Sequence, residues 1–146
     1  MDPLRLTIVQ TPRTKKTHNR TVDLGKRCPR CRRGVRTIVL PSESFEAFEA
    51  AVAPPLRHWM AERGLAPIAH PVNVAAIFYR EALRGDAVGF YQALADVLQA
   101  AGVVVDDKWI VSWDGSRLDT DSARPRIELV ITSAGPVPPE QGALAL

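Results

Sequence analysis

The sequence predicts one α+β (α/β) domain, in which a mixed sheet packs against two helices. Two features predict this: several short segments alternate apolar and polar residues, and two longer segments carry apolar residues every three or four positions. The 146 residues are the size of one ordinary domain, and the 46% hydrophobic content is typical of a packed core. We expect the domain to span residues 1–132, and the Pro- and Gly-rich residues 133–146 to form a disordered tail.

The first strands are predicted from the N-terminal third of the chain. Leu4, Leu6 and Ile8 alternate with polar residues, as in a strand with one buried face. Thr21–Leu24 and Val35–Leu40 are predicted to form the two arms of a hairpin, with a Gly-flanked basic tip between them.

A helix is predicted to follow the hairpin. Ser42 is a candidate N-cap, and apolar residues recur at helical spacing from Phe45 to Met60. Gly64 is the expected end. Pro54 and Pro55 predict a kink or a restart within this segment, because proline removes a helical donor and crowds the preceding turn.

The second half of the chain is predicted to alternate strands and a helix. Val72–Tyr79 is apolar on both alternating sets, which favours a central strand covered on both faces. Phe90–Ala101 is amphipathic and is followed by Gly102, a candidate C-cap. Trp109–Trp113 and Ile127–Thr132 are predicted to be strands, with the tryptophans packing in the core.

Charge is strongly segregated along the chain. Residues 1–40 contain 11 Lys and Arg against 2 Asp, whereas residues 41–146 contain 8 Lys and Arg against 14 Asp and Glu. A basic arm over residues 11–36 on an acidic body favours a nucleic-acid partner over a merely solvated loop. The arm lacks aromatic residues, so phosphate contacts are expected rather than base stacking. The candidate nucleic-acid-binding residues are Arg13, Lys15, Lys16, Asn19, Arg20, Lys26, Arg27, Arg30, Arg32 and Arg33.

Cys28 and Cys31 are the only cysteines, and they form one C-x-x-C pair. No export signal and no long apolar segment are evident, so we expect a cytoplasmic protein with reduced thiols. The pair has the spacing of half a structural zinc site, which His18 or a second subunit would have to complete. Bystander thiols are the favoured alternative, and a local redox pair is a third.

Three carboxylates near the second helix are candidates for chemistry. Asp86 precedes the helix, and Asp106 and Asp107 follow it; Asp96 and Asp114 are nearby in sequence. Clustered carboxylates hold Mg²⁺ or Mn²⁺, which activates water and neutralises charge on a scissile phosphate. Taken singly, Asp86 is better explained as an N-cap, and Asp106 and Asp107 as an ordinary turn.

The segment Gly85–Ile110, GDAVGFYQALADVLQAAGVVVDDKWI, resembles the core of the RusA-type Holliday junction resolvase family. Pro12–Asn19 is similar to that family's basic loop, Leu40–Glu49 to the start of its first helix, and Arg124–Thr132 to its last strand. The resemblance implies a homodimeric endodeoxyribonuclease that uses Mg²⁺ or Mn²⁺ on Holliday junctions and branched DNA in recombination and repair. Asp86, Asp107 and Asp106 would be its metal-binding and catalytic residues.

The chain departs from the family pattern at three positions. The family places a carboxylate at position 88, an asparagine at 89 and a lysine at 92, where this chain has Val88, Gly89 and Gln92. These changes remove a metal ligand and a cation near the scissile phosphate. A junction-binding protein without catalytic activity is therefore the alternative to a nuclease, and a zinc-ribbon-like adaptor is a third, weaker one.

The helix raises a geometric condition for any metal site. At 1.5 Å per residue, the segment from 88 to 101 is about 20 Å long. Asp86 and Asp107 therefore meet only if the chain runs back along the helix, or if Asp86 of one subunit joins Asp106 and Asp107 of the other.

Overall fold

A mixed sheet forms the centre of the protein. The structure is a computed structural model that describes residues 1–14, 20–23, 37–40 and 42–135. The central strand β4 (Val72–Arg80) pairs antiparallel with β7 (Arg126–Ser133), which pairs antiparallel with β1 (Leu4–Ile8). β5 (Ile110–Ser112) and β6 (Arg117–Thr120) both pair parallel with β4. The predicted mixed sheet with two helices is thus confirmed.

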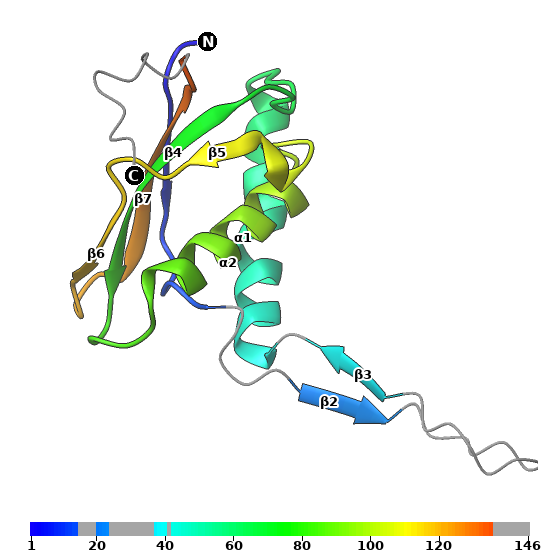
Figure 1. Cartoon of the computed structure of the whole chain (residues 1–146), viewed down its shortest axis with the longest axis vertical. Helices are drawn as coiled ribbons and strands as arrows, with labels where there is room; N and C mark the ends of the chain where they lie inside the picture. Colours follow the sequence, from blue (N-terminus) through cyan, green and yellow to red (C-terminus); the bar gives the residue numbers. More distant parts are fainter. Residues whose placement is uncertain (15–19, 24–36, 41, 136–146) are drawn as a thin grey trace, which may run out of the picture.

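Two helices, α1 (Glu43–Glu62) and α2 (Ala87–Ala100), lie on the same side of this sheet (Figure 1). Their apolar faces meet the inward side chains of β1, β4 and β7. The residues with at most 1% exposure include Phe78 from the sheet and Leu94, Val97 and Leu98 from α2. This burial holds α2, and with it the carboxylates at its two ends, in a fixed position on the sheet.

β4 is covered on one face only, which corrects the expectation of a strand buried on both faces. Val72, Val74, Ala76 and Phe78 are buried beneath the helices, whereas the alternate residues from Asn73 to Tyr79 are half-buried. The apolar side chains on this second face are those of Ala75, Ile77 and Tyr79. Arg126 lies over the Tyr79 ring, with its guanidinium carbon 3.7 Å from the ring centroid.

α1 runs without interruption through Pro54 and Pro55, so the predicted kink or restart is wrong. Ser42 is the N-cap as predicted, and its hydroxyl accepts a hydrogen bond from the Phe45 N–H. Both prolines are exposed, and so are Ala50 and Ala51, whose carbonyls lose their helical donors. Water can satisfy those carbonyls, while the opposite face remains packed in the core.

The chain between α2 and β7 differs in detail from the prediction. Gly102 ends α2 with φ +73°, as expected for a C-terminal glycine. A short 3-10 helix, η1 (Asp107–Trp109), replaces the first part of the predicted strand, and β5 is accordingly brief. β6 was not predicted, because Leu118 is its single apolar residue.

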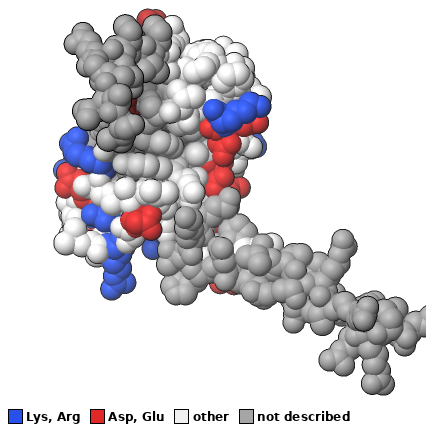
Figure 2. All heavy atoms as spheres, viewed as in Figure 1, with Lys and Arg blue, Asp and Glu red and all other residues white. Residues whose placement is uncertain are grey.

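The predicted hairpin is present as β2 (Arg20–Asp23) and β3 (Thr37–Leu40), paired antiparallel from Arg20↔Leu40 to Asp23↔Thr37. It projects away from the sheet and helices (Figure 1). The tip between these strands and residues 136–146 lie outside the described residues. The predicted tail begins too early, because Ser133 is the last residue of β7 and the Ala134 N–H donates to the Pro71 carbonyl at 3.0 Å. Where the face seen in Figure 2 is not covered by grey atoms, basic and acidic side chains are interspersed. No helix in the described part of the chain is long and apolar enough to cross a membrane.

Candidate functional site

Asp86 is the N-cap of α2. Its Oδ1 accepts a hydrogen bond from the Gly89 N–H at 2.5 Å, which satisfies one of the free donors of the first helical turn. The preceding loop is held by Arg80, whose Nη1 donates to the carbonyl oxygens of Arg84 (3.2 Å) and Gly85 (3.5 Å). The carboxylate therefore has a structural role, and it is exposed enough to have a second one.

Gly89 allows the start of the basic arm to pack against α2. A Cβ at this position would lie 3.1 Å from Asp86 Oδ1 and 3.2 Å from the Thr14 methyl group. Those distances leave no comfortable room for the asparagine that the family pattern places here. A glycine at position 89 thus fits the close approach of the Thr11–Thr14 segment to α2.

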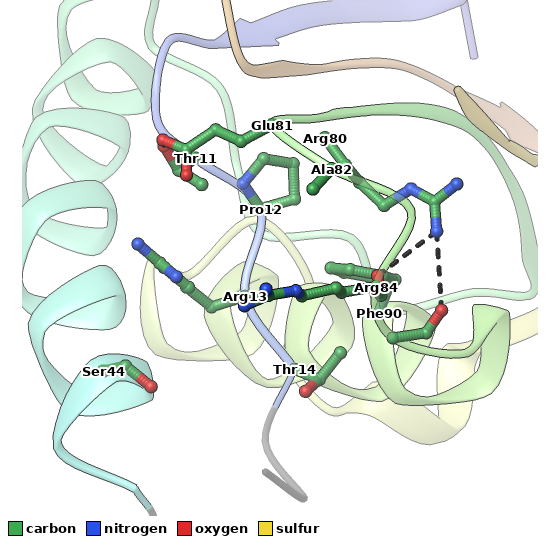
Figure 3. Close-up of a pocket in the computed structure, with 11 residues that line it drawn as sticks. Thr11, Pro12, Arg13, Thr14, Ser44, Arg80, Glu81, Ala82, Arg84 and Phe90 are labelled. Carbon is green, nitrogen blue, oxygen red and sulfur yellow. Dashed lines mark hydrogen bonds between the residues drawn. The ribbon is translucent and has the colours of Figure 1, made fainter. Parts of the chain in front are cut away.

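The Thr11–Thr14 segment forms one side of a basic pocket of about 280 Å³ (Figure 3). The β4–α2 loop and the first turn of α1 complete the pocket. Arg84 extends from that loop toward the segment that carries Arg13, and both side chains are exposed. The one acidic lining residue, Glu81, accepts a hydrogen bond from the Thr11 hydroxyl at 2.8 Å. Neither Arg13 nor Arg84 forms an ion pair with any residue that the structure describes.

A second cavity, of about 620 Å³, runs along the outer side of α2. Val88, Gln92 and Asp96 lie along one side of the helix at i, i+4 and i+8, and Asp107 lines the same groove from η1. The side chain of Val88 is 56% exposed. The groove therefore joins two carboxylates, one carboxamide and an apolar rim in a single depression.

The chain runs back along α2 to bring Asp107 to this groove. Gly102 turns the chain, and the Asp107 N–H then donates to Gln99 Oε1 at 2.8 Å. Further along, Trp113 stacks on Tyr91, with centroids 4.8 Å apart and planes at 7°. The return along the helix thus brings Asp107 to the groove, but Asp86 does not line it. A site shared between two subunits stays a prediction.

Asp106 does not line this groove, and its carboxylate instead contacts Lys108 in the following turn. Its Oδ1 accepts the Lys108 N–H at 3.0 Å, and its Oδ2 lies 3.2 Å from Lys108 Nζ. The backbone N–H of Lys108, and then its ammonium group, hold the pKa of Asp106 below its usual range. Asp106 is thus an ionised cap of η1.

The predicted site residues are brought together only in part. Asp107 shares its groove with positions 88 and 92, whereas Asp86 and Asp106 each cap a helix start. Among the described residues no cluster of three or more His, Cys, Asp or Glu side chains is placed to hold a metal ion. Trp113 packs against the core as predicted, whereas Trp109 does not and instead lies beneath Lys108 Nζ, 5.8 Å from its ring centroid. Several predicted residues lie outside the described part, or have side chains outside it: Lys15, Lys16, His18, Asn19, Arg20, Lys26, Arg27, Cys28, Arg30, Cys31, Arg32 and Arg33.

Sequence reasoning missed Arg84 and underrated Asp96. The spacing of Gln92 and Asp96 on one helix face was available as a signal, but the return of Asp107 to that face was not. Arg84 lies in a loop whose path no periodicity reveals. The chain matches no protein-family model and no curated protein sequence. Function must therefore be inferred from the residues and their arrangement.

Proposed function

We propose that this protein is a resolvase-like endodeoxyribonuclease that binds four-way and other branched DNA as a homodimer and cuts it with Mg²⁺ or Mn²⁺, in recombination and repair. One observation carries the proposal. Asp107 lies in one groove with Val88 and Gln92, the positions where the resemblance expects a carboxylate and a lysine. Three positions of the resemblance, two on α2 and one on η1, thus line one groove, which supports the proposal.

The groove offers ligands suited to a hard cation. Mg²⁺ is commonly held by one or two carboxylates, with water and substrate phosphate completing its shell. Asp107 and Asp96 would supply two carboxylates, and Asp86 lies two residues before Val88 at the same end of the helix. The bound ion would lower the pKa of a water molecule and neutralise charge on the scissile phosphate. A zinc site at Cys28 and Cys31 remains a separate proposal, because both lie outside the described residues.

The basic pocket would hold the DNA backbone. Arg13 and Arg84 are both exposed and have no carboxylate partner among the described residues, so both guanidinium groups can bind a phosphate. Arg13 and Arg84 lie where the basic arm leaves the body, next to the first turn of α2. A backbone phosphate at this point would place neighbouring phosphates along the arm and around α2 toward the groove.

The pocket can be tested by salt dependence of junction binding. Removing the cation that meets one phosphate should reduce the slope of log affinity against log salt by about 1. We expect this for Arg13→Ala and for Arg84→Ala. Arg57→Ala is the control, because Arg57 is an exposed arginine on α1 whose guanidinium donates to the Ala100 carbonyl, away from the pocket. Equal effects of all three variants would argue against a phosphate site at the pocket.

A second candidate function is junction binding without cleavage. The apolar Val88 and the neutral Gln92 in the groove favour this function. A carboxylate at position 88 would strengthen metal binding and a cation at position 92 would stabilise the transition state, and the chain has neither. The fold and the basic pocket are unaffected by these two residues.

Cleavage of a synthetic four-way junction with Mn²⁺ separates the two functions. A nuclease should cut, and Asp107→Asn should abolish cutting while binding persists. Val88→Asp with Gln92→Lys should raise the rate, because it restores an anionic ligand and a cation. Binding without cutting by the wild-type chain would favour the second function. No preference for branched over linear duplex DNA would contradict both.

A further inference from the structure

β1 has a free edge. In the sheet order β1-β7-β4-β5, β1 is terminal, and β7 is its only partner among the described strands. Apart from that ladder, no backbone hydrogen bond joins residues 4–8 to any other described segment. The outer row of N–H and C=O groups is therefore available to another strand.

A groove of about 350 Å³ runs along this edge. Residues 5–10 form one side, and α1 forms the other with Ala51, Val52, Pro55, Leu56 and Trp59. Val9, at the end of the strand, is 74% exposed. An edge strand beside an apolar helix face accepts an extended chain, with main-chain hydrogen bonds for affinity and alternate side chains in the groove.

We propose that the occupant is β1 of a second copy of this chain, paired antiparallel about a two-fold axis at Leu6. In this register Leu6 faces Leu6 of the partner subunit, and Arg5 faces the partner's Thr7. The inward residues of both copies stay on the helix-covered face, so the two sheets become continuous. The contact is isologous, as a two-fold dimer requires.

The residues of β1 favour this occupant and this register. Residues directly opposite in an antiparallel pair lie on the same face of the sheet. The two-fold axis must therefore pass midway between one residue and the same residue of the partner strand. An axis at Arg5 would place two guanidinium groups opposite each other, and an axis at Thr7 would pair Leu4 with the partner's Gln10. The axis at Leu6 pairs apolar with apolar residues and leaves each Arg5 opposite a neutral hydroxyl.

β1 also lacks most of the features that keep edge strands apart. Between Pro3 and Pro12 it contains no proline, and Arg5 is its one charged residue. The proposal names the surface of the homodimer in the proposed function, and it lies at the opposite end of the sheet from the α2 groove. A monomer that cuts junctions would overturn the dimer in both proposals and leave the nuclease standing. A dimer that does not bind DNA would overturn the nuclease and leave the β1 contact standing.

Two substitutions at one exposed position test the register. Thr7→Glu would place a carboxylate opposite the partner's Arg5, and Thr7→Lys would place an ammonium group there. Each change occurs twice per dimer. We expect the dissociation constant, measured by sedimentation equilibrium at low salt, to fall roughly 2- to 30-fold for Thr7→Glu and to rise by a similar factor for Thr7→Lys.

Folding stability provides the internal control. Within one chain Thr7 lies opposite Glu128 of β7. At a concentration where the chain is monomeric, the Tm should therefore be higher for Thr7→Lys than for Thr7→Glu. This order is the reverse of the order expected for dimer affinity. Opposite signs for association and stability would support the proposal. A wild-type chain that stays monomeric at the highest soluble concentration, or equal shifts in association for both variants, would overturn it.

Crosslinking gives a second, independent readout. In a Cys28→Ser, Cys31→Ser background, Arg5→Cys combined with Thr7→Cys should form an oxidised dimer, because each new thiol faces its counterpart across the axis. Either substitution alone places the thiol opposite an unchanged residue and should crosslink weakly. Equal crosslinking by the single variants would exclude this register.

Discussion

Substitution of Asp86 separates its two roles, helix cap and metal ligand. Its Oδ1 accepts the Gly89 N–H at 2.5 Å, so Asp86→Ala removes both the cap and the charge at the start of α2. Loss of a cap costs about 1 kcal/mol, and loss of a carboxylate at a helix N-terminus costs about 0.3–1 kcal/mol more. Asp86→Ser keeps an oxygen acceptor at the cap and removes only the charge, so it should cost about 0.3–1 kcal/mol.

These costs are measurable as shifts in thermal unfolding. For a chain of this size 1 kcal/mol corresponds to roughly 3–5 °C in Tm. We expect a loss of about 4–8 °C for Asp86→Ala and a few degrees at most for Asp86→Ser. If Asp86 also binds metal, both variants should lose Mn²⁺-dependent junction cleavage to a similar extent, because serine is a poor ligand for a hard cation.

Ser42→Ala is the matched control. Ser42 caps α1 as Asp86 caps α2, and its hydroxyl accepts the Phe45 N–H at 3.3 Å. The variant should lose about 1 kcal/mol of stability with cleavage unchanged when assayed well below its Tm. The reasoning would be refuted if Asp86→Ser cuts as well as the wild type, which would make Asp86 a cap alone. Equal loss of cleavage in Ser42→Ala would instead show that cleavage follows stability.

Two further predictions concern the rest of the fold. A hydrogen bond from Arg126, at 2.8 Å, is the main cause that holds the pKa of Asp121 below its usual 3.8. The stability that this bond contributes is present above pH 3.8 and is lost as the pH falls through the lowered pKa of the folded state. Asp121→Asn should therefore make Tm fall less steeply with pH below about 4. An unchanged acid limb in that variant would contradict this. Gly102→Ala should lower the free energy of unfolding, measured in urea, by about 1–2 kcal/mol, because φ is +73° at this position. A steric clash does not contribute, since the added Cβ would meet nothing within 4 Å. Unchanged stability would show that the backbone relaxes there.

Much of the fold could be predicted from local pattern, and the exceptions have physical causes. Leu4, Leu6 and Ile8 alternate in the sequence and are partly or fully buried in β1, because period and burial agree there. Pro54 and Pro55 break a local rule, but they lie on the exposed face of α1, where packing of the opposite face outweighs two missing hydrogen bonds. β6 has one apolar residue and exists because the end of β4 offers it a partner.

The site was less predictable than the fold. Asp86 was recognisable from its position as an N-cap, which it is. Asp106 was predicted as part of a turn, and the structure makes it the N-cap of η1, a short helix that was not predicted. What brings Asp107 beside Gln92 is the turn at Gly102 and the stacking of Trp113 on Tyr91. Those are long-range contacts, and no spacing in the sequence encodes their direction.

The three departures from the resolvase pattern differ in what they would affect. Gly89 belongs to the packing of the Thr11–Thr14 segment on α2, because a Cβ there would crowd both Thr14 and Asp86. Val88 and Gln92, by contrast, line an open groove, where a longer or charged side chain meets solvent. Replacing these two changes the chemistry of the groove at little cost to the fold, whereas replacing Gly89 disturbs the base of the basic arm. If the proposed function is correct, DNA binding and catalysis would depend on different residues of α2, so substitutions at positions 88 and 92 would change cleavage and leave DNA binding intact.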